Sequence, residues 1–302
     1  MKLALFVDEG NGDWHARRLV KALTARGAEV VTTSLKLCAF DTASPTGLVI
    51  PGFDGALPDG AFVRSISHGT LEQITFRLGI LHALRESGIR VWNDARAIER
   101  CVDKSTATFH LHRAGLPVPG TITVEGQAAA RGRFGALVAP VVVKPMFGAQ
   151  GVGIARAATA NDLPPSPEVG DVYYMQSFIP PRSVDYHEDW RVFVSGGRVL
   201  AAMSRRAKSW ITNVAQGAEP GRHDADGEMS ELAVAAARAL GADYAGVDLM
   251  PSPTGIQVIE VNGVAAWQGL QRVTGFNIAR AIVDDLLDRR LPQAAPLAAQ
   301  RA

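Results

Sequence analysis

A predicted β-hairpin over residues 245–262 constrains the fold of this chain more than any other stretch. Two apolar runs flank the segment Pro-Ser-Pro-Thr-Gly, whose prolines and glycine disfavour a continuous strand. Because strand side chains alternate between two faces, a hairpin without a bulge places Asp248, Glu260 and Asn262 on one face. Ile259 then points to the opposite face. Two carboxylates and an amide oxygen are ligands that Mg²⁺ prefers, although any half-buried polar strand shows the same alternation.

The composition limits the classes of function that this chain can have. With 302 residues it is long enough for two or three packed units, and 47% hydrophobic with 20% charged residues is typical of a soluble globular protein. A net charge of +1 gives no basis for binding nucleic acid or a membrane surface. Cys38 and Cys101 alone exclude a disulfide framework and a thiolate metal site. We recognise no signal sequence and no apolar run of about 18 residues, so a cytoplasmic protein is expected.

The first 93 residues are predicted to form a doubly wound α/β unit. The pattern predicts strands over residues 3–7, 29–31, 47–50 and 88–92, and helices over residues 14–26 and 70–85. The loop at 8–13 lacks the G-x-G-x-x-G of a dinucleotide site and carries acidic residues, which excludes that class of ligand. Arg64 and His68 fall on a loop of this unit. They are read as surface residues, with contact to an anionic substrate as the alternative.

The remaining residues indicate a mixed α and β organisation without internal repeats. Helices are expected over residues 104–114, 229–240 and 277–289, and strands over residues 140–145, 171–179, 190–194 and 198–204. A Gly-Gly turn joins the last two strands. The residues after 291 show no periodicity and are expected to be disordered.

A glycine-rich loop follows the predicted strand that ends at Lys144. Gly148, Gly151 and Gly153 allow backbone N–H groups to wrap an anion, and Lys144 supplies a positive charge at the base of the loop. No Gly-Lys-Ser/Thr follows, so the loop is not a Walker A motif. A plain mobile turn explains such a loop when it stands alone. Together with Lys104 upstream and the carboxylates downstream, it indicates an anion-binding flap.

Six motifs, taken in order along the chain, resemble those of the ATP-grasp superfamily. They are Asp103-Lys-Ser, Val141-Val-Val-Lys-Pro with the glycine-rich loop, Met175-Gln-Ser-Phe-Ile, Asp189-Trp-Arg, Gly246-Val-Asp-Leu and Ile259-Glu-Val-Asn. Within that superfamily the chain resembles the RimK-like α-L-glutamate ligases, which are ATP-dependent carboxylate–amine ligases. The resemblance implies an ATP-grasp fold of the α/β and α+β class with an N-terminal Rossmann-like (pre-ATP-grasp) domain. The implied boundaries are 1–93 for that domain, 94–180 for a central subdomain with the flap, 181–291 for a C-terminal subdomain with the Mg²⁺ site, and 292–302 for a disordered tail.

The same resemblance implies roles for individual residues. Nucleotide contacts are implied for Lys104, Lys144, Gly148, Gln150, Gly151, Gly153, Gln176, Ser177, Phe178, Ile179 and Asp189. The segment 174–179 is expected to run past adenine and to offer backbone donors and acceptors. Asp248, Glu260 and Asn262 are expected to hold two Mg²⁺ ions, for which Mn²⁺ can substitute. The expected catalytic residues, which engage the γ-phosphate and an acyl phosphate, are Arg191, Arg205 and Asn213.

The reaction implied by the resemblance joins a carboxylate to an amine. ATP activates the carboxylate as an acyl phosphate, and the α-amine of an amino acid, expected to be L-glutamate, displaces phosphate. The acceptor is expected to be a small molecule or a peptide, and a pterin such as tetrahydromethanopterin is the candidate named for it. A carrier or ribosomal protein terminus is the alternative. A homo-oligomer without nucleic-acid or membrane partners is expected. The opposing hypothesis, a non-catalytic nucleotide-binding protein of this fold, is disfavoured because clustered carboxylates repel each other without metal.

Some residues near the expected site have a simpler structural interpretation or depart from the family pattern. Trp210 and Trp267 are expected to be packing residues, and Lys208 part of a solvated strand edge. Ser177 stands where relatives usually carry Glu. After Asn262 the chain reads Gly-Val-Ala-Ala-Trp-Gln-Gly, where many glutamate-adding relatives read Ser-Ser-Pro-Gly, close to where the amino acid should sit. The seven histidines show no metal-ligand spacing, and none is assigned to catalysis.

Overall fold

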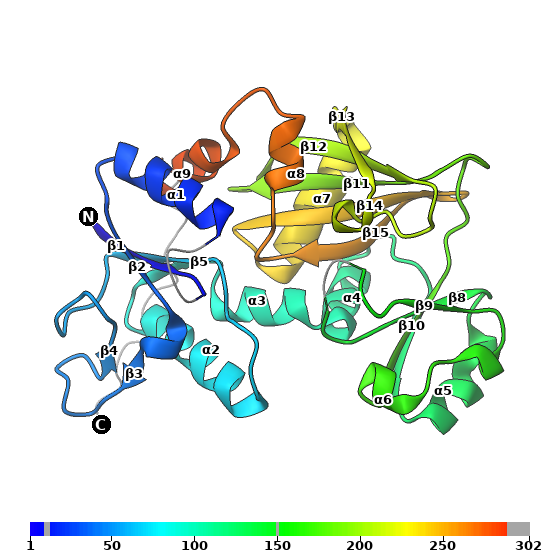
Figure 1. Ribbon diagram of the computed structural model, residues 1–302, viewed down its shortest axis with the longest axis horizontal. Coiled ribbons are helices and arrows are strands. Elements are labelled where there is room, and N and C mark those ends of the chain that lie inside the picture. The colour runs from blue at the N-terminus through cyan, green and yellow to red at the C-terminus, as the bar shows by residue number, and fades with distance from the viewer. Residues whose placement is uncertain (9–12, 149–150, 289–302) are drawn as a thin grey trace.

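A computed structural model shows three units, each built on its own sheet (Figure 1). It describes residues 1–8, 13–148 and 151–288. The predicted tail therefore lies outside the described residues. Among the described helices, none combines the length and the apolar character that a membrane crossing requires.

The N-terminal unit is a parallel four-stranded sheet in the order β2-β1-β5-β6, as expected for a Rossmann-like domain. Its strands are β1 (Lys2–Phe6), β2 (Glu29–Thr33), β5 (Gly60–Val63) and β6 (Arg90–Trp92), and its helices are α1 (Trp14–Ala25) and α2 (Leu71–Glu86). Each helix begins where the sequence provides an N-cap. Asp13 accepts from the Ala16 N–H, and Thr70 forms a capping box with Gln73.

The third strand predicted for this sheet is wrong. Residues 47–50 contribute only β4 (Leu48–Val49), which pairs with β3 (Ala39–Phe40) in a separate two-stranded sheet. The strand that pairs with β1 is instead β5, a run of four buried residues that begins at a glycine. Such a short apolar run carries too little periodicity to be distinguished from a loop.

The central unit is an antiparallel four-stranded sheet in the order β7-β10-β8-β9. Its strands are β7 (Thr121–Glu125), β8 (Val141–Lys144), β9 (Ala155–Ala157) and β10 (Val172–Ser177), and its helices are α5 (Gln127–Arg133) and α6 (Ser166–Val169). The glycine-rich loop connects β8 to β9, so the flap is the turn of a hairpin.

The C-terminal unit is an antiparallel five-stranded sheet in the order β13-β12-β11-β14-β15, with α7 covering one face (Figure 1). Its strands are β11 (His187–Ser195), β12 (Arg198–Ala207), β13 (Glu219–His223), β14 (Tyr244–Ser252) and β15 (Gly255–Asn262), and its helices are α7 (Gly227–Leu240) and α8 (Gln268–Arg272). The predicted hairpins 190–204 and 245–262 are both present, as β11–β12 and β14–β15.

Three helices join the units. The consecutive helices α3 (Ala95–Val102) and α4 (Lys104–Arg113) follow β6, and Asp103 caps α4 by accepting from the N–H groups of Ser105 and Thr106. That cap fixes Lys104 at the first helical position. The last described helix, α9 (Ile278–Asp288), returns to the N-terminal unit and packs along α1, where Arg26 forms ion pairs with Asp284 and Asp288 (Figure 1). The boundaries at residues 93 and 180 remain a proposal, and α9, from the last part of the described chain, also packs against the first unit.

Candidate functional site

A cavity of about 770 Å³ lies between the central and C-terminal sheets and reaches the N-terminal unit at His15. The cavity runs along strands β14 and β15, so that it has two ends and a middle. One end, which we call the hinge end, is lined by residues 176–182 with Ile154 and Met250. The middle holds the charged side chains of both sheets. The other end, which we call the α8 end, is lined by His15, residues 213–215, Val264, Ala266, Gln268, Gly269 and Arg272.

The β14–β15 hairpin brings the three predicted oxygen ligands to one place. Asp248 pairs directly with Glu260, and Gly246 pairs with Asn262, so the three side chains share a face and line the cavity. Asn262 donates its amide Nδ2 to the carbonyl of Gly246 at 3.3 Å, which leaves its Oδ1 as an acceptor. The donor set is oxygen only, and it fits a hard divalent cation.

The predicted orientation of Ile259 is wrong, because the hairpin contains a β-bulge. Leu249 pairs with Val258 directly after the pair of Asp248 and Glu260, which leaves Ile259 as the extra residue. Ile259 lines the cavity instead of joining the core on the opposite face.

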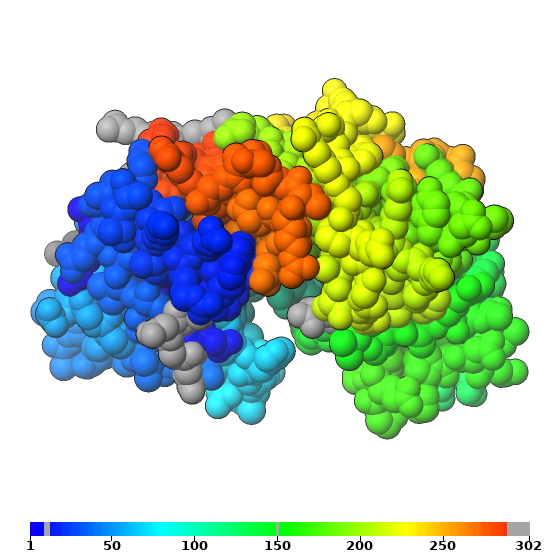
Figure 2. All heavy atoms as spheres, turned by 45° about the horizontal axis from the view of Figure 1, so that its top comes forward, coloured from blue at the N-terminus to red at the C-terminus, as the bar shows by residue number. Residues whose placement is uncertain are grey.

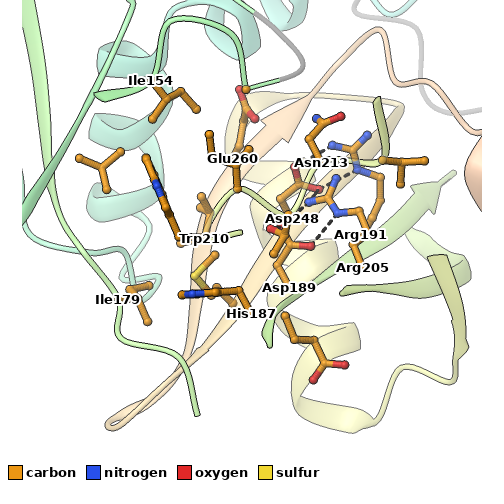
Figure 3. A pocket seen from close by; sticks show the side chains of 18 of the residues that line it. Ile154, Ile179, His187, Asp189, Arg191, Arg205, Trp210, Asn213, Asp248 and Glu260 are labelled. Atoms are coloured by element: carbon orange, nitrogen blue, oxygen red, sulfur yellow. Dashed lines mark hydrogen bonds and ion pairs between the residues drawn. The ribbon is translucent and has the colours of Figure 1, made fainter. Parts of the chain in front are cut away.

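A row of alternating charges occupies the middle of the cavity (Figure 3). The guanidinium of Arg191 binds both oxygens of Asp248 at 2.7 Å. Arg205 binds both oxygens of Asp189 at 2.6 Å and approaches Asp248 at 3.2 Å. Thr212 donates its hydroxyl to Asp189 at 2.6 Å. Asp189, Arg205 and Asp248 are all buried, so these bidentate pairs hold the side chains in a fixed geometry.

The pairing overturns one argument made from the sequence. Burial raises the pKa of Asp248, but the guanidinium of Arg191 and then that of Arg205 outweigh it, and the net pKa is lowered. The negative charge of Asp248 is therefore balanced by the two guanidiniums without any metal. From the sequence, a non-catalytic protein is disfavoured because clustered carboxylates repel each other without metal. That reason does not hold, because arginine already neutralises Asp248.

Two lysines face the carboxylates from the other side. Lys144 at the end of β8 donates to Oε1 of Gln176 at 2.8 Å, and Nζ of Lys104 lies 3.9 Å from Glu260. Burial lowers the pKa of Lys144 to about 8; Glu260 opposes this effect and Lys104 adds to it. Lys104 also donates to the carbonyl of Gly148 at 3.1 Å, which ties it to the root of the flap.

The glycine-rich flap extends over the cavity and contacts a loop of the C-terminal unit. Gly148, Gly151 and Gly153 are all described, whereas Gln150 lies outside the described residues. Gly151 has a φ of +72°, and a Cβ there would lie 2.8 Å from Cγ2 of Ile211 and 2.9 Å from Nε2 of Gln216. The flap approaches the 209–217 loop so closely that only glycine fits without displacement. On that loop Asn213 lines the cavity, and its Oδ1 accepts from the N–H of Ala215 at 2.8 Å.

The hinge segment only partly matches its predicted role. Gln176, Ser177, Phe178 and Ile179 all line the cavity. However, the N–H of Ser177 donates to Gly120 at 2.8 Å and that of Phe178 donates to Pro140 at 2.9 Å. These two backbone donors are occupied because the pairing of β10 with the chain before β7 and before β8 continues into the hinge, so they are not offered to an adenine ring.

An aromatic and apolar wall at the hinge end was missed from the sequence. Trp210 lies in the cavity, edge-to-face with Phe178 at 6.1 Å, and His187 is a further neighbour of Phe178 at 6.5 Å (Figure 3). Trp267 is buried completely, as a packing residue should be, whereas Trp210 is not purely a packing residue. The loop position of Trp210 carries no periodicity from which its orientation could be predicted.

Contacts between the N-terminal unit and the segment after Asn262 were also missed. Arg64 is buried and donates to the carbonyl of Ala265 at 3.0 Å. His15 shares a hydrogen bond of 2.8 Å with Asp13, and its Nε2 accepts from the N–H of Trp267 at 3.1 Å. Arg64 is thus not a free surface residue but holds the 263–267 segment against the first unit. His68 is exposed and does not line the cavity.

Comparisons with known proteins identify the family and the fold. The family model for the RimK-like ATP-grasp domain matches residues 101–286. The tetrahydromethanopterin:alpha-L-glutamate ligase of Methanococcus maripaludis is 35% identical over 76% of this chain and 78% of its own, and that of Methanosarcina acetivorans is 30% identical over 91% and 95%. Among solved structures, the ATP-grasp ligase PsnB complexed with minimal precursor, Mg and ADP has a TM-score of 0.70 at 21% identity, covering 95% of this chain and 97% of that one. This last likeness concerns the fold.

Proposed function

Because the chain belongs to the RimK-like ATP-grasp family, whose members are ATP-dependent carbon–nitrogen ligases, we propose that it joins the α-amine of L-glutamate to a substrate carboxylate. The observation that carries this proposal is the charge arrangement in the middle of the cavity. Two lysines, two arginines and three oxygen-bearing side chains converge there from both sheets and from the start of α4. Such a group suits a polyphosphate that loses its terminal phosphoryl group.

In this proposal the nucleotide lies with its base at the hinge end. The apolar side chains of Ile154 and Ile179 and the indole of Trp210 form the walls for a planar ring (Figure 3). The triphosphate then extends toward Lys144 and Lys104 in the middle. The flap, with Gly148, covers it, because Lys104 already contacts the carbonyl of Gly148.

Asp248, Glu260 and the Oδ1 of Asn262 are the residues proposed to hold Mg²⁺. Bound there, Mg²⁺ supplies positive charge that offsets the charge of the phosphate oxygens. The likeness to a ligase solved with Mg and ADP supports the use of both ligands. Two ions, and replacement by Mn²⁺, remain part of the proposal.

The arginines are proposed to act on the group that is transferred. Phosphoryl transfer to a substrate carboxylate breaks the bond between the β-γ bridging oxygen and phosphorus, and it forms an acyl phosphate and ADP. The α-amine then attacks the acyl carbon, loses a proton, and phosphate leaves. Arg191 and Arg205 stand beside Asp248 with planar guanidiniums whose forks match phosphate oxygens. Asn213 presents its amide to the same space. No covalent enzyme intermediate is required by this scheme.

The acceptor proposed is a pterin carboxylate of the tetrahydromethanopterin type. Support comes from the names of the two archaeal relatives, which share 35% and 30% identity with the chain over most of its length. A relative from Pseudoalteromonas translucida, 30% identical over 90% of the chain, is named only as a probable alpha-L-glutamate ligase, so a protein or peptide terminus is the competing acceptor.

An ADP-release screen tests the proposal. The full chain with ATP and Mg²⁺ is offered the common L-amino acids, each crossed with a pterin bearing a free carboxylate, a deazaflavin coenzyme and peptides. ADP release with L-glutamate and the pterin, together with a product heavier by one glutamyl residue in mass spectrometry, is expected. Release of AMP would contradict an acyl phosphate. Release of ADP with peptides alone would move the acceptor to the competing class.

A further inference from the structure

The α8 end of the cavity differs in charge from the middle. Among the described residues, Arg272 is the one arginine or lysine that lines it, and no carboxylate lines it. Asp13 lies behind His15, but its carboxylate is bound by the His15 ring at 2.8 Å and faces Arg64 at 3.6 Å. This end therefore offers positive charge without a built-in counter-ion.

Arg272 differs from the other arginines and lysines that line the middle of the cavity. Arg191 and Arg205 are engaged with buried carboxylates, and Lys104 faces Glu260. The Arg272 side chain makes no ion pair or hydrogen bond within the part of the chain that the structure describes. A guanidinium on an apolar and neutral wall attracts an anion more strongly than one already paired with a carboxylate.

The backbone around Arg272 is held in place from the N-terminal unit. Arg64 and His15 hold the carbonyl of Ala265 and the N–H of Trp267. Trp267 is wholly buried and directly precedes α8, so the short helix starts from a fixed point. Gln268 and Arg272 are four residues apart on α8 and both line the cavity, which places an amide beside the guanidinium.

The position also suits a molecule entering from solvent. Arg272 and Gln268 are exposed at the mouth of the cavity. In Figure 2 the orange segment that contains α8 borders a hollow. The hollow lies between the N-terminal unit, in blue and cyan, and the central unit, in green. Arg272 and Gln268 are therefore accessible to a substrate in solvent.

We propose that Arg272, with Gln268 beside it, binds a substrate carboxylate that does not react. This inference rests on the proposed function, since a ligase that uses glutamate has such a carboxylate on the amino acid, and its acceptor can carry another. The guanidinium forms a charge-assisted pair with that carboxylate and repels a cationic amino acid in the same place. The subsite thus selects acidic substrates without touching the atoms that react.

Equilibrium binding tests this before any turnover. The full chain, saturated with Mg²⁺ and a non-hydrolysable ATP analogue, is titrated with L-glutamate and with its neutral isostere L-glutamine by calorimetry. R272Q is expected to weaken L-glutamate binding by about 10- to 100-fold and to abolish the preference over L-glutamine. R272K should recover part of the loss. R280Q is the matched control, because Arg280 is an exposed arginine on α9 that pairs with Asp284 and does not line the cavity.

The kinetics distinguish the two sources of the carboxylate. If R272Q leaves L-glutamate binding intact but raises the KM of the acceptor by a similar factor, the carboxylate belongs to the acceptor and the subsite stands. If R272Q changes neither value by more than twofold, the inference is overturned, and retained binding of the ATP analogue shows that the variant is folded.

Failure of the proposed function gives a different result. In that case the wild-type chain binds no L-glutamate and releases no ADP with it. The comparison of wild type with R272Q is then made on L-aspartate and on the carboxylate-bearing pterin, deazaflavin coenzyme and peptides of the screen. Tighter binding of any of them to the wild type supports the subsite, and equal or absent binding to both proteins overturns it.

Discussion

Glu260 is the carboxylate in the cavity that the fold needs least. Asp248 is buried between two guanidiniums, whereas Glu260 is one-third exposed and its nearest cation, Lys104, lies at 3.9 Å. We therefore expect E260Q to leave the unfolding temperature within about 2 °C of the wild type. ADP release should fall by about 10²–10³-fold, the loss typical of removing one electrostatic group from an active site.

Steady-state ADP release and thermal unfolding check this prediction together. E219Q is the control, since Glu219 is an exposed residue of β13 outside the cavity lining. Activity of E260Q within threefold of wild type would remove Glu260 from the proposed metal site.

Lys144 gives the nucleotide site a pH dependence whose sign follows from its lowered pKa. With a pKa of about 8, the ammonium is present at pH 7 and is largely lost by pH 9 in the free protein. Phosphate oxygens favour the charged form and raise this pKa on binding. ATP binding should therefore take up a proton at pH 8.5 and almost none at pH 7, and the KM for ATP should rise above pH 8.

Calorimetry in two buffers of different ionisation enthalpy measures the proton uptake directly. The uptake at pH 8.5 should disappear in K144M. The same uptake in K144M and in the wild type would assign the titration to another group.

At the scale of elements, the flap depends on one glycine. Gly151 combines a φ of +72° with the close approach to Ile211 and Gln216. G151A is expected to raise the KM for ATP by at least about tenfold, because the added Cβ displaces the flap from the 209–217 loop, while the flap contributes little to global stability. G170A is the matched control. Gly170 also has a positive φ, +61°, but nothing lies within 4 Å of its missing Cβ. Equal KM values in G151A and wild type would show that the contact is dispensable.

The same scale shows where sequence reasoning succeeds and where it stops. The β14–β15 hairpin was predictable because its apolar alternation and its turn residues agree. The approach of Asp248 to Glu260 was predicted from residue parity, but it depends on the bulge, because the register next to the turn, in which Leu249 pairs with Val258, would otherwise place Ile259 opposite Asp248. The bulge at Ile259 was not predictable, because an extra residue in a strand leaves no compositional trace. Likewise β5 is too short to show periodicity, and the true neighbour of β1 was missed.

Long-range contacts were beyond the sequence for a different reason. The pairing of Arg191 and Arg205 with Asp248 joins residues from three strands, and the bond from Arg64 to Ala265 joins two units. Such contacts depend on how whole sheets are placed, which local patterns do not encode. The sequence therefore predicted which charged residues line the middle of the cavity, but not which of them form ion pairs with one another.

At the scale of the whole molecule, Asn93 connects the N-terminal unit to the β14–β15 hairpin. It is fully buried, and its amide donates to the carbonyls of Tyr244 and Gly263 at 2.7 and 2.6 Å. Its Oδ1 accepts from the N–H groups of Asp243 and Tyr244 at 2.6 and 3.2 Å. N93A leaves these backbone groups buried without partners and should lower the free energy of unfolding by about 3 kcal/mol or more.

Urea unfolding checks this value. N161A, which removes an exposed asparagine from a surface turn, should stay within about 0.5 kcal/mol of wild type. A loss of less than 1 kcal/mol in N93A would show that water replaces the lost partners. Since Gly263 directly follows Asn262, the variant is also expected to lose ADP release beyond the loss of folded protein.

Because Arg191 and Arg205 neutralise Asp248 inside the protein, this buried carboxylate needs no divalent ion when the enzyme holds no nucleotide. Folding is then independent of metal supply, and excess EDTA should leave the unfolding temperature of the nucleotide-free protein unchanged within about 1 °C in a thermal scan. A marked drop would mean that a cation, rather than arginine, keeps the resting protein together. The protein would then need a divalent ion only while nucleotide is bound.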